Sequence, residues 1–304
     1  MNLNIGITGS NGFIGKHLIN TLNKASNDFH VKPFDHSYDI CEQKAMEIFL
    51  KNLNVIVHLA GANRDTKQEI FRVNVIGTLN LLECISKCYP WIKVIVASSF
   101  HIYKPISEPT MIEESHALEP QTIYGLSKKI AEELCWYYNR IFNLNIKILR
   151  LSNVFGIGCR PRYNSVISTF IDAAIRGEKI RIKGNGSSTR DFIAVSDVVD
   201  AIVNLIRKPD TMKELEIFNI CSGKLITLNQ IVEVIMTKIN NIKIERYAKE
   251  GKKEGFLLGS NKKAIQSGIL KFPLKEFQEE IVNIINYEKK LREFENFKTI
   301  ALQK

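Results

Sequence analysis

Short apolar runs alternate with longer amphipathic stretches through the first half of the chain. The amphipathic stretches repeat apolar side chains at a spacing of about 3.6 residues, as at Ile76, Leu79 and Leu82, which predicts helices. The apolar runs are rich in β-branched residues and predict strands at 3–7, 30–34, 54–59, 92–97 and 146–150. Such alternation is typical of a parallel sheet with helices on both faces, which binds ligands at the carboxyl ends of its strands.

The pattern changes after Gly156, where the regular alternation ends. The later segments predict a helix at 164–176, a glycine-rich turn at 184–188, a helix at 196–207 and a strand at 216–220. We therefore expect an α/β protein, with a Rossmann-type doubly wound parallel sheet and a smaller C-terminal substrate-binding lobe over its ligand-binding edge.

The composition bears on which kinds of molecule the protein binds. The chain has 304 residues and a formal net charge of +10, which invites a nucleic-acid interpretation. The lysines are spread along the whole chain, however, and their clusters lack interleaved aromatic side chains that could stack on bases. We expect no nucleic-acid partner and interpret the lysines as a solvated surface. A positive field that attracts an anionic small molecule is the alternative.

The sequence shows no sign of export or of a membrane-spanning segment. The chain starts directly with a strand-like run, without the basic start of a signal peptide, and no apolar run reaches the roughly 20 residues of a membrane helix. The six cysteines are scattered without a CxxC pair, so we interpret them as reduced thiols rather than as zinc ligands. We expect a cytoplasmic protein with no membrane partner and no metal site.

A glycine-rich turn directly follows the first expected strand. Residues 8–15 read TGSNGFIG, a GxxGxxG spacing. Gly9 permits the tight turn, Gly12 lets the backbone approach a pyrophosphate, and Gly15 allows close packing of helix on strand. The free N–H groups of the helix that starts here, around Phe13 and Ile14, favour phosphates. The segment predicts a dinucleotide site, and a purely structural turn is the alternative.

An acidic residue ends the second expected strand. Asp35 stands 20 residues after the last glycine of the turn, where a carboxylate can accept hydrogen bonds from the adenosine ribose. This carboxylate would repel a 2′-phosphate, so NAD is favoured, while Lys16 and His36 keep NADP open. Asp39 and Ile40 should flank the adenine. The dinucleotide-binding domain should span 1–155, with 191–222 returning to it, and the lobe should comprise 156–190 and 223–304.

Three side chains suggest proton transfer from an alcohol. Tyr124 and Lys128 lie four residues apart at the start of an amphipathic helix, so they share one face. A phenol with a pKa of about 10 is a poor base at neutral pH, but a neighbouring ammonium favours the phenolate. Ser99 ends a buried strand, where its hydroxyl can bind the reacting oxygen. The YxxxK spacing alone is commonplace. It indicates a catalytic site here because a strand that ends in Ser99 precedes it.

Several motifs follow one another in a fixed order along the chain. They are Gly9-x-x-Gly12-x-x-Gly15, His58-Leu59-Ala60-Gly61, Asn74-x-x-Gly77-Thr78, Ser98-Ser99-x-x-x-Tyr103, Tyr124-x-x-x-Lys128, Arg150-x-x-Asn153-Val154-Phe155-Gly156 and Arg190-Asp191-Phe192. With them the chain resembles extended short-chain dehydrogenase/reductases of the NAD-dependent nucleotide-sugar epimerase/dehydratase family, of the UDP-glucose 4-epimerase type.

The resemblance implies a role for individual residues. It implies a catalytic trio of Ser99, Tyr124 and Lys128, cofactor contacts by Leu59, Ala60 and Gly61, and substrate contacts by Ser99, Asn153 and Arg190. Arg190 would hold the nucleotide diphosphate, because a planar guanidinium can bind phosphate oxygens in pairs.

Two stretches depart from the family pattern. Related 4,6-dehydratases carry an Asp-Glu pair after the catalytic hydroxyl, whereas this chain has Phe100 and His101, so dehydration is not expected. Many members also carry a late Arg followed by an Asp, for phosphate and ribose. Here Lys253 can still meet a phosphate, but the carboxylate is missing.

We therefore expect an NAD-dependent nucleotide-sugar 4-epimerase that acts by transient hydride transfer at C4. The alternative is an NAD(P)H-dependent 4-keto-sugar-nucleotide reductase of cell-surface polysaccharide precursor synthesis, which would use the same residues once. A catalytically idle, cofactor-binding regulator is a third interpretation, although the intact trio speaks against it. The expected partner is a nucleotide-sugar, and assembly as a homodimer stays open.

Overall fold

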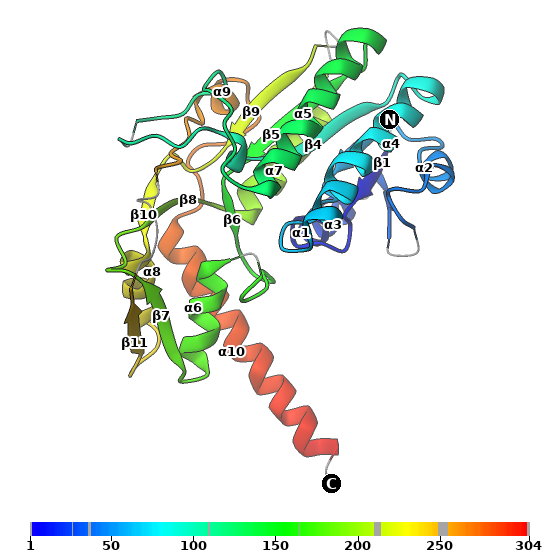
Figure 1. The fold of residues 1–304 in the computed structure, drawn as a ribbon. Coiled ribbons are helices and arrows are strands. Elements are labelled where there is room, and N and C mark those ends of the chain that lie inside the picture. The colour runs from blue at the N-terminus through cyan, green and yellow to red at the C-terminus, as the bar shows by residue number, and fades with distance from the viewer. Residues whose placement is uncertain are drawn as a thin grey trace.

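A six-stranded parallel sheet is the centre of the computed structural model (Figure 1). The structure describes residues 2–25, 27–35, 38–108, 110–163, 165–209, 214–248 and 255–302. In spatial order the strands are β2 (Phe29–Pro33), β1 (Leu3–Thr8), β3 (Val55–His58), β4 (Lys93–Ser99), β5 (Ile146–Leu151) and β9 (Glu216–Ile220). All five pairings within this sheet are parallel, so the carboxyl ends of the strands meet at one edge.

Helices cover both faces of this sheet. Helices α1 (Phe13–Lys24) and α7 (Val195–Arg207) pack on one face, and α2 (Gln43–Phe49), α4 (Gly77–Cys88) and α5 (Ile123–Phe142) pack on the other. Successive strand residues point to opposite faces, so Ile95 joins the first core while Val94 and Val96 join the second. The expected doubly wound Rossmann-type fold is confirmed.

A smaller lobe lies beside the carboxyl edge of the sheet. Its strands are β6 (Asn153–Phe155), β8 (Thr189–Ala194) and β10 (Leu225–Thr227) in one sheet, and β7 (Lys179–Lys183) and β11 (Lys243–Tyr247) in another. Its helices are α6 (Val166–Ile175), α8 (Leu228–Met236) and α10 (Phe277–Leu302). Aliphatic residues such as Ile167, Ile231 and Ile284 form its separate core. The last turns of α10 extend away from this core (Figure 1).

The chain passes between the two parts more than once. After β6 and β8 have entered the small sheet, α7 and β9 pack on and extend the large one. The domain boundaries given above remain a proposal. Two short helices, α3 (Lys67–Phe71) and α9 (Lys262–Gln266), complete the α-helices among the described residues. Among the residues that the structure describes, no helix has the length and apolar character to cross a membrane.

A buried ion pair joins α5 to strand β5 of the large sheet. The Arg150 guanidinium donates to the Glu132 carboxylate at 2.7 Å, and both side chains are only 3% exposed. The same guanidinium donates to the Tyr103 hydroxyl at 2.9 Å and to the Glu114 carbonyl at 2.7 Å. These bonds compensate the charge of Arg150 in the interior and fix the segment that follows β4 against β5.

Removing one partner of this ion pair should therefore lower the free energy of unfolding strongly. Arg150→Met leaves the Glu132 carboxylate buried and uncompensated, so we expect the free energy of unfolding in urea to fall by about 3–5 kcal/mol. Lys87→Met is the control, because it breaks the exposed pair between Lys87 and Glu83 and should change the free energy of unfolding far less. Equal losses in the two variants would contradict this account.

Candidate active site

Two adjoining cavities form a trough at the carboxyl edge of the large sheet. The larger has a volume of about 570 Å³ and the smaller about 430 Å³. Gly9, Asn11, Gly12 and Gly61 line both, so the glycine turn lies where the cavities meet. The trough runs from Asp35 at one end to Tyr124 at the other, which is the extended shape that a dinucleotide needs.

The glycine turn leaves no room for side chains. Gly9 has a φ of +67°, and a Cβ there would lie 2.7 Å from the backbone nitrogen of Ala60. A Cβ at Gly15 would lie 2.3 Å from the Gly9 carbonyl oxygen. The turn therefore packs tightly on the end of β3, and α1 begins at Phe13 without a side-chain cap. Its first N–H groups point to a cavity wall that suits a pyrophosphate.

The smaller cavity contains the predicted adenosine end. Asp35, Asp39, Ile40 and Ala60 line it. Asp39 forms an exposed ion pair with Arg72 at 2.6 Å, and the Cys41 N–H bond, followed by Arg72, lowers the pKa of Asp39 despite partial burial. The structure places these residues where the sequence predicts them, and their contacts with a cofactor remain predictions. His36 lies outside the described residues.

The predicted catalytic trio meets at the other end of the trough. Ser99, Tyr124 and Lys128 all line the larger cavity, together with Leu59 and the glycine turn that includes Phe13 and Ile14. Burial raises the pKa of the Tyr124 phenol above 10.0, and a hydrogen bond with Ser99 lowers it in part. Burial lowers the pKa of Lys128 from 10.5 to about 8. The two hydroxyls are therefore joined and face the space that a substrate would fill.

Lys128 is held by its surroundings rather than by the phenol. Its Nζ donates to the Ala97 carbonyl at 3.0 Å and lies next to Gly61, where a Cβ would be 3.2 Å away. The expected lowering of the Tyr124 pKa by this ammonium is not seen in the protein alone, where burial raises the pKa and only the hydrogen bond with Ser99 lowers it in part. Both side chains still share one helical face.

Asn74 connects three walls of this site. It lies in a π-helical segment, Arg72–Ile76, and its side chain bonds the N–H of Ala62 at 2.8 Å and the carbonyl of Ala62 at 2.9 Å. Its amide also donates to the Ser127 hydroxyl at 2.8 Å. Such π-helical turns often occur at functional sites. This one ties the loop after β3 to the helix that carries Tyr124.

His58 is part of the framework beneath the trough. Its ring bridges the hydroxyls of Thr8 at 2.8 Å and Thr78 at 3.0 Å. Burial lowers the pKa of His58 to about 3, and the charge of Lys128 adds to this effect. The ring is neutral at physiological pH and joins β1, β3 and α4.

The predicted substrate residues occupy different positions. Asn153 lines the larger cavity and donates to the Asp191 carbonyl at 3.0 Å. Arg190 is not among the residues that line this cavity. Its positive charge nevertheless contributes to lowering the pKa of His101, which does line the cavity. Asp191 is buried and accepts the Ser222 and Gly223 N–H groups at 2.8 and 3.0 Å. Lys253 lies outside the described residues.

The structure adds lining residues that the sequence did not single out. Asn63, Arg64, Arg160 and Tyr163 also line the larger cavity. Arg64 and Arg160, together with Lys16 and Lys128, give the cavity four cationic side chains. No carboxylate is among its described lining residues. Such a surface attracts anionic ligands. The one signal that could have identified Arg64 and Arg160 as site residues is that each is a basic side chain in a loop that follows an expected strand.

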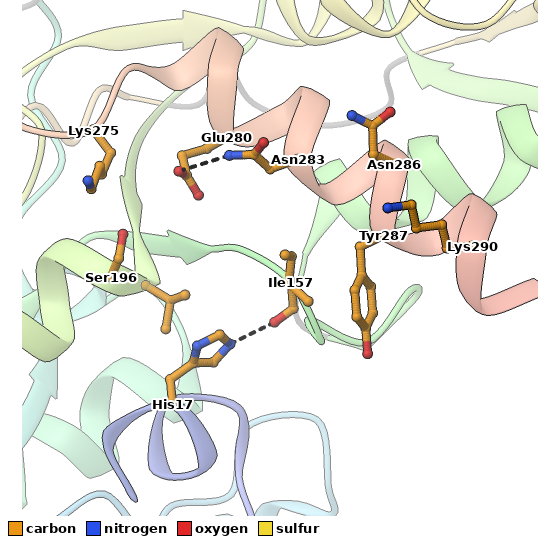
Figure 2. A pocket seen from close by; sticks show the side chains of 10 residues that line it. His17, Ile157, Ser196, Lys275, Glu280, Asn283, Asn286, Tyr287 and Lys290 are labelled. Atoms are coloured by element: carbon orange, nitrogen blue, oxygen red, sulfur yellow. Dashed lines mark hydrogen bonds between the residues drawn. The ribbon is translucent and has the colours of Figure 1, made fainter. Parts of the chain in front are cut away.

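Another cavity, of about 550 Å³, lies between α1, the start of α7 and α10 (Figure 2). The His17 ring donates to the Ile157 carbonyl oxygen there at 2.8 Å, and the Glu280 carboxylate accepts from the Asn283 side chain at 3.4 Å. None of the predicted site residues lines it. In the described part of the chain, no group of three or more His, Cys, Asp or Glu side chains is placed to hold a metal ion.

Comparisons with known proteins agree with this geometry. The model of the NAD dependent epimerase/dehydratase family matches residues 5–221. A candidate UDP-glucose 4-epimerase of Methanocaldococcus jannaschii is 31% identical over 256 residues, covering 77% of this chain and 81% of the relative. A GDP-6-deoxy-D-talose 4-dehydrogenase of Aggregatibacter actinomycetemcomitans is 32% identical over 241 residues, covering 77% and 79%. UDP-glucose 4-epimerase from Thermotoga maritima, solved with UDP-glucose, has a TM-score of 0.85 at 26% identity, covering 95% of this chain and 99% of that one.

The adenosine end of the trough can be tested through cofactor choice. Asp35→Ala should weaken the binding of NAD far more than that of NADP, because only the 2′-phosphate is repelled by the carboxylate. Titration of both cofactors by calorimetry measures the two dissociation constants. Glu42→Ala, outside both cavities, is the control. An equal loss of affinity for the two cofactors in the Asp35 variant would remove Asp35 from the ribose site.

Proposed function

The chain belongs to the NAD-dependent epimerase/dehydratase family, and we propose that it is a nucleotide-sugar 4-epimerase. It is an NAD-dependent enzyme, as are its relatives that act on sugar nucleotides. The observation that supports the proposal is the hydrogen-bonded pair of Ser99 and Tyr124 at the end of a trough that begins at the glycine turn. A bound sugar whose carbinol reaches this end of the trough would meet a proton acceptor there.

NAD, when bound, accepts a hydride from a carbinol carbon and returns it. The protein residues handle the proton. The Tyr124 oxygen, as phenolate, takes the proton of the C4 hydroxyl, and it gives the proton back when the carbinol is restored. Ser99 binds the reacting oxygen and holds it against Tyr124. Because burial disfavours the phenolate, the positive charge of Lys128 has to offset part of this cost.

The same cavity argues against elimination. Of the two residues that stand in place of the dehydratase acid and base, Phe100 is buried and packs against Gly259 and Cys221. Only His101 faces the cavity. Without a carboxylate among the described lining residues, the site lacks the acid and base pair that the related dehydratases use. The residues support oxidation and reduction at one carbinol.

A 4-keto-sugar-nucleotide reductase is the second candidate. The 4-dehydrogenase relative at 32% identity supports it, because that chemistry needs the same trio. In a cell this activity would serve the synthesis of polysaccharide precursors. An epimerase keeps its cofactor through the cycle, whereas a reductase has to exchange it. Stoichiometric release of oxidised cofactor during turnover of a 4-keto sugar nucleotide would favour the reductase. Assembly as a homodimer and a cytoplasmic location remain predictions.

Substitution of the phenol tests the proposal. Tyr124→Phe keeps the ring and its packing but removes the proton acceptor, so kcat should fall by roughly 10²–10⁴-fold. The assay follows the interconversion of UDP-glucose and UDP-galactose, since a solved neighbour binds UDP-glucose. NAD affinity and the thermal unfolding midpoint should stay close to those of the unchanged protein.

Tyr163→Phe serves as the matched control. It removes a hydroxyl from the same cavity without touching the trio, so its kcat should change far less. A Tyr124→Phe enzyme that keeps most of its turnover on a good substrate would show that another group accepts the proton.

A further inference from the structure

His101 presents an unused hydrogen-bonding ring beside the reaction centre. Its ring lines the larger cavity and meets the ring of Tyr124 edge to face, with 5.9 Å between the centroids. Within the described part of the chain, neither imidazole nitrogen forms a hydrogen bond. A ring that touches the catalytic tyrosine and keeps its polar atoms free is suited to contact a bound molecule.

The backbone of His101 is fixed by the same elements that hold the reacting groups. It lies in the short 3-10 turn Phe100–Ile102, and its N–H donates to the Ser99 hydroxyl at 3.3 Å. The flanking side chains of Phe100 and Ile102 are both buried. A Cβ at Gly125 would lie 2.2 Å from the His101 carbonyl oxygen, so the turn packs directly on the start of α5. These contacts hold the backbone of His101 beside Ser99 and the start of α5.

The charge of the surroundings determines what His101 can bind. Desolvation by neighbouring atoms lowers the pKa of His101, and the positive charge of Arg190 lowers it further. Lys128 and Arg160 also line this cavity. The imidazole is therefore neutral at physiological pH, and a neutral imidazole has one donor and one acceptor nitrogen. This combination is complementary to a hydroxyl, which also donates and accepts.

We propose that His101 is a specificity-determining residue that hydrogen-bonds a sugar hydroxyl next to the reacting carbinol. This inference rests on the proposed function, because it requires a sugar bound against Tyr124. With C4 at the Tyr124 oxygen, the neighbouring hydroxyls are those on C3 and C6. His101 would then select sugars that carry the contacted hydroxyl over their deoxy counterparts. Arg190 would have a different role, since a diphosphate is common to all such substrates.

The test compares a substrate with its 3-deoxy and 6-deoxy analogues. With the NAD-loaded protein, kcat/KM is measured for the best sugar nucleotide found and for each analogue. His101→Phe keeps a flat ring but removes both nitrogens. It should lower kcat/KM for the full substrate about 10-fold, the equivalent of one hydrogen bond, while changing it little for one of the analogues. His101→Gln, which retains a donor and an acceptor, should restore most of the discrimination.

Two variants provide the comparison. His30→Phe, on the exposed face of β2, should leave every ratio unchanged. Arg190→Ala should raise KM equally for the substrate and both analogues, if it contacts the diphosphate. If His101→Phe lowers kcat/KM equally for the substrate and both analogues, or changes none of them, the proposal is overturned.

The outcome can be separated from that of the proposed function. If the unchanged protein turns over no sugar nucleotide, the proposed activity fails. His101 is then judged from dissociation constants of UDP-glucose and its two deoxy analogues on the NAD-loaded protein. A preference for UDP-glucose over one analogue that disappears in His101→Phe and persists in His101→Gln supports the inference. A preference that is absent, or that survives in His101→Phe, overturns it.

Discussion

The close approach of the glycine turn to the end of β3 is the constraint on which the site depends. No Cβ fits at Gly9 or Gly15, because backbone atoms of the turn itself and of Ala60 already occupy the space. This packing sets the start of α1 at the sheet edge and leaves its first N–H groups facing the cavity. The same packing puts the turn in the trough whose other end contains Tyr124.

Electrostatics then divides the trough into regions with different chemistry. Cations surround the larger cavity, while the smaller one contains Asp35 and an Asp39 that pairs with Arg72. Burial disfavours both charged forms that the proposed chemistry needs, the phenolate of Tyr124 and the ammonium of Lys128. A phenolate and an ammonium stabilise each other where they lie close together, so the proposed chemistry needs both side chains on the same helical face. The activity should therefore depend on an assembled site rather than on either residue alone.

Local pattern was enough to predict the sheet and the glycine turn, whereas the catalytic trio came from the resemblance to the family and its roles stay predictions. Apolar runs place the strands, and the ends of parallel strands bring Ser99 and the turn to one edge. Loop geometry was not predictable, because Arg64 and Arg160 reach the cavity only through the path of segments without periodicity. Arg190 follows the family motif, yet it is not among the residues that line the cavity. Nor did the pattern show that Phe100 turns into a core while His101 faces the substrate space.

In the proposed reaction a hydride leaves C4 of a sugar nucleotide and returns to it within one trough. A substrate labelled with deuterium at C4 tests it directly, with the product analysed by NMR and mass spectrometry. We predict that deuterium slows turnover and remains at C4 of the product, with the configuration at C4 inverted. Exchange of the label with water, or turnover that leaves the C4 configuration unchanged, would contradict the account.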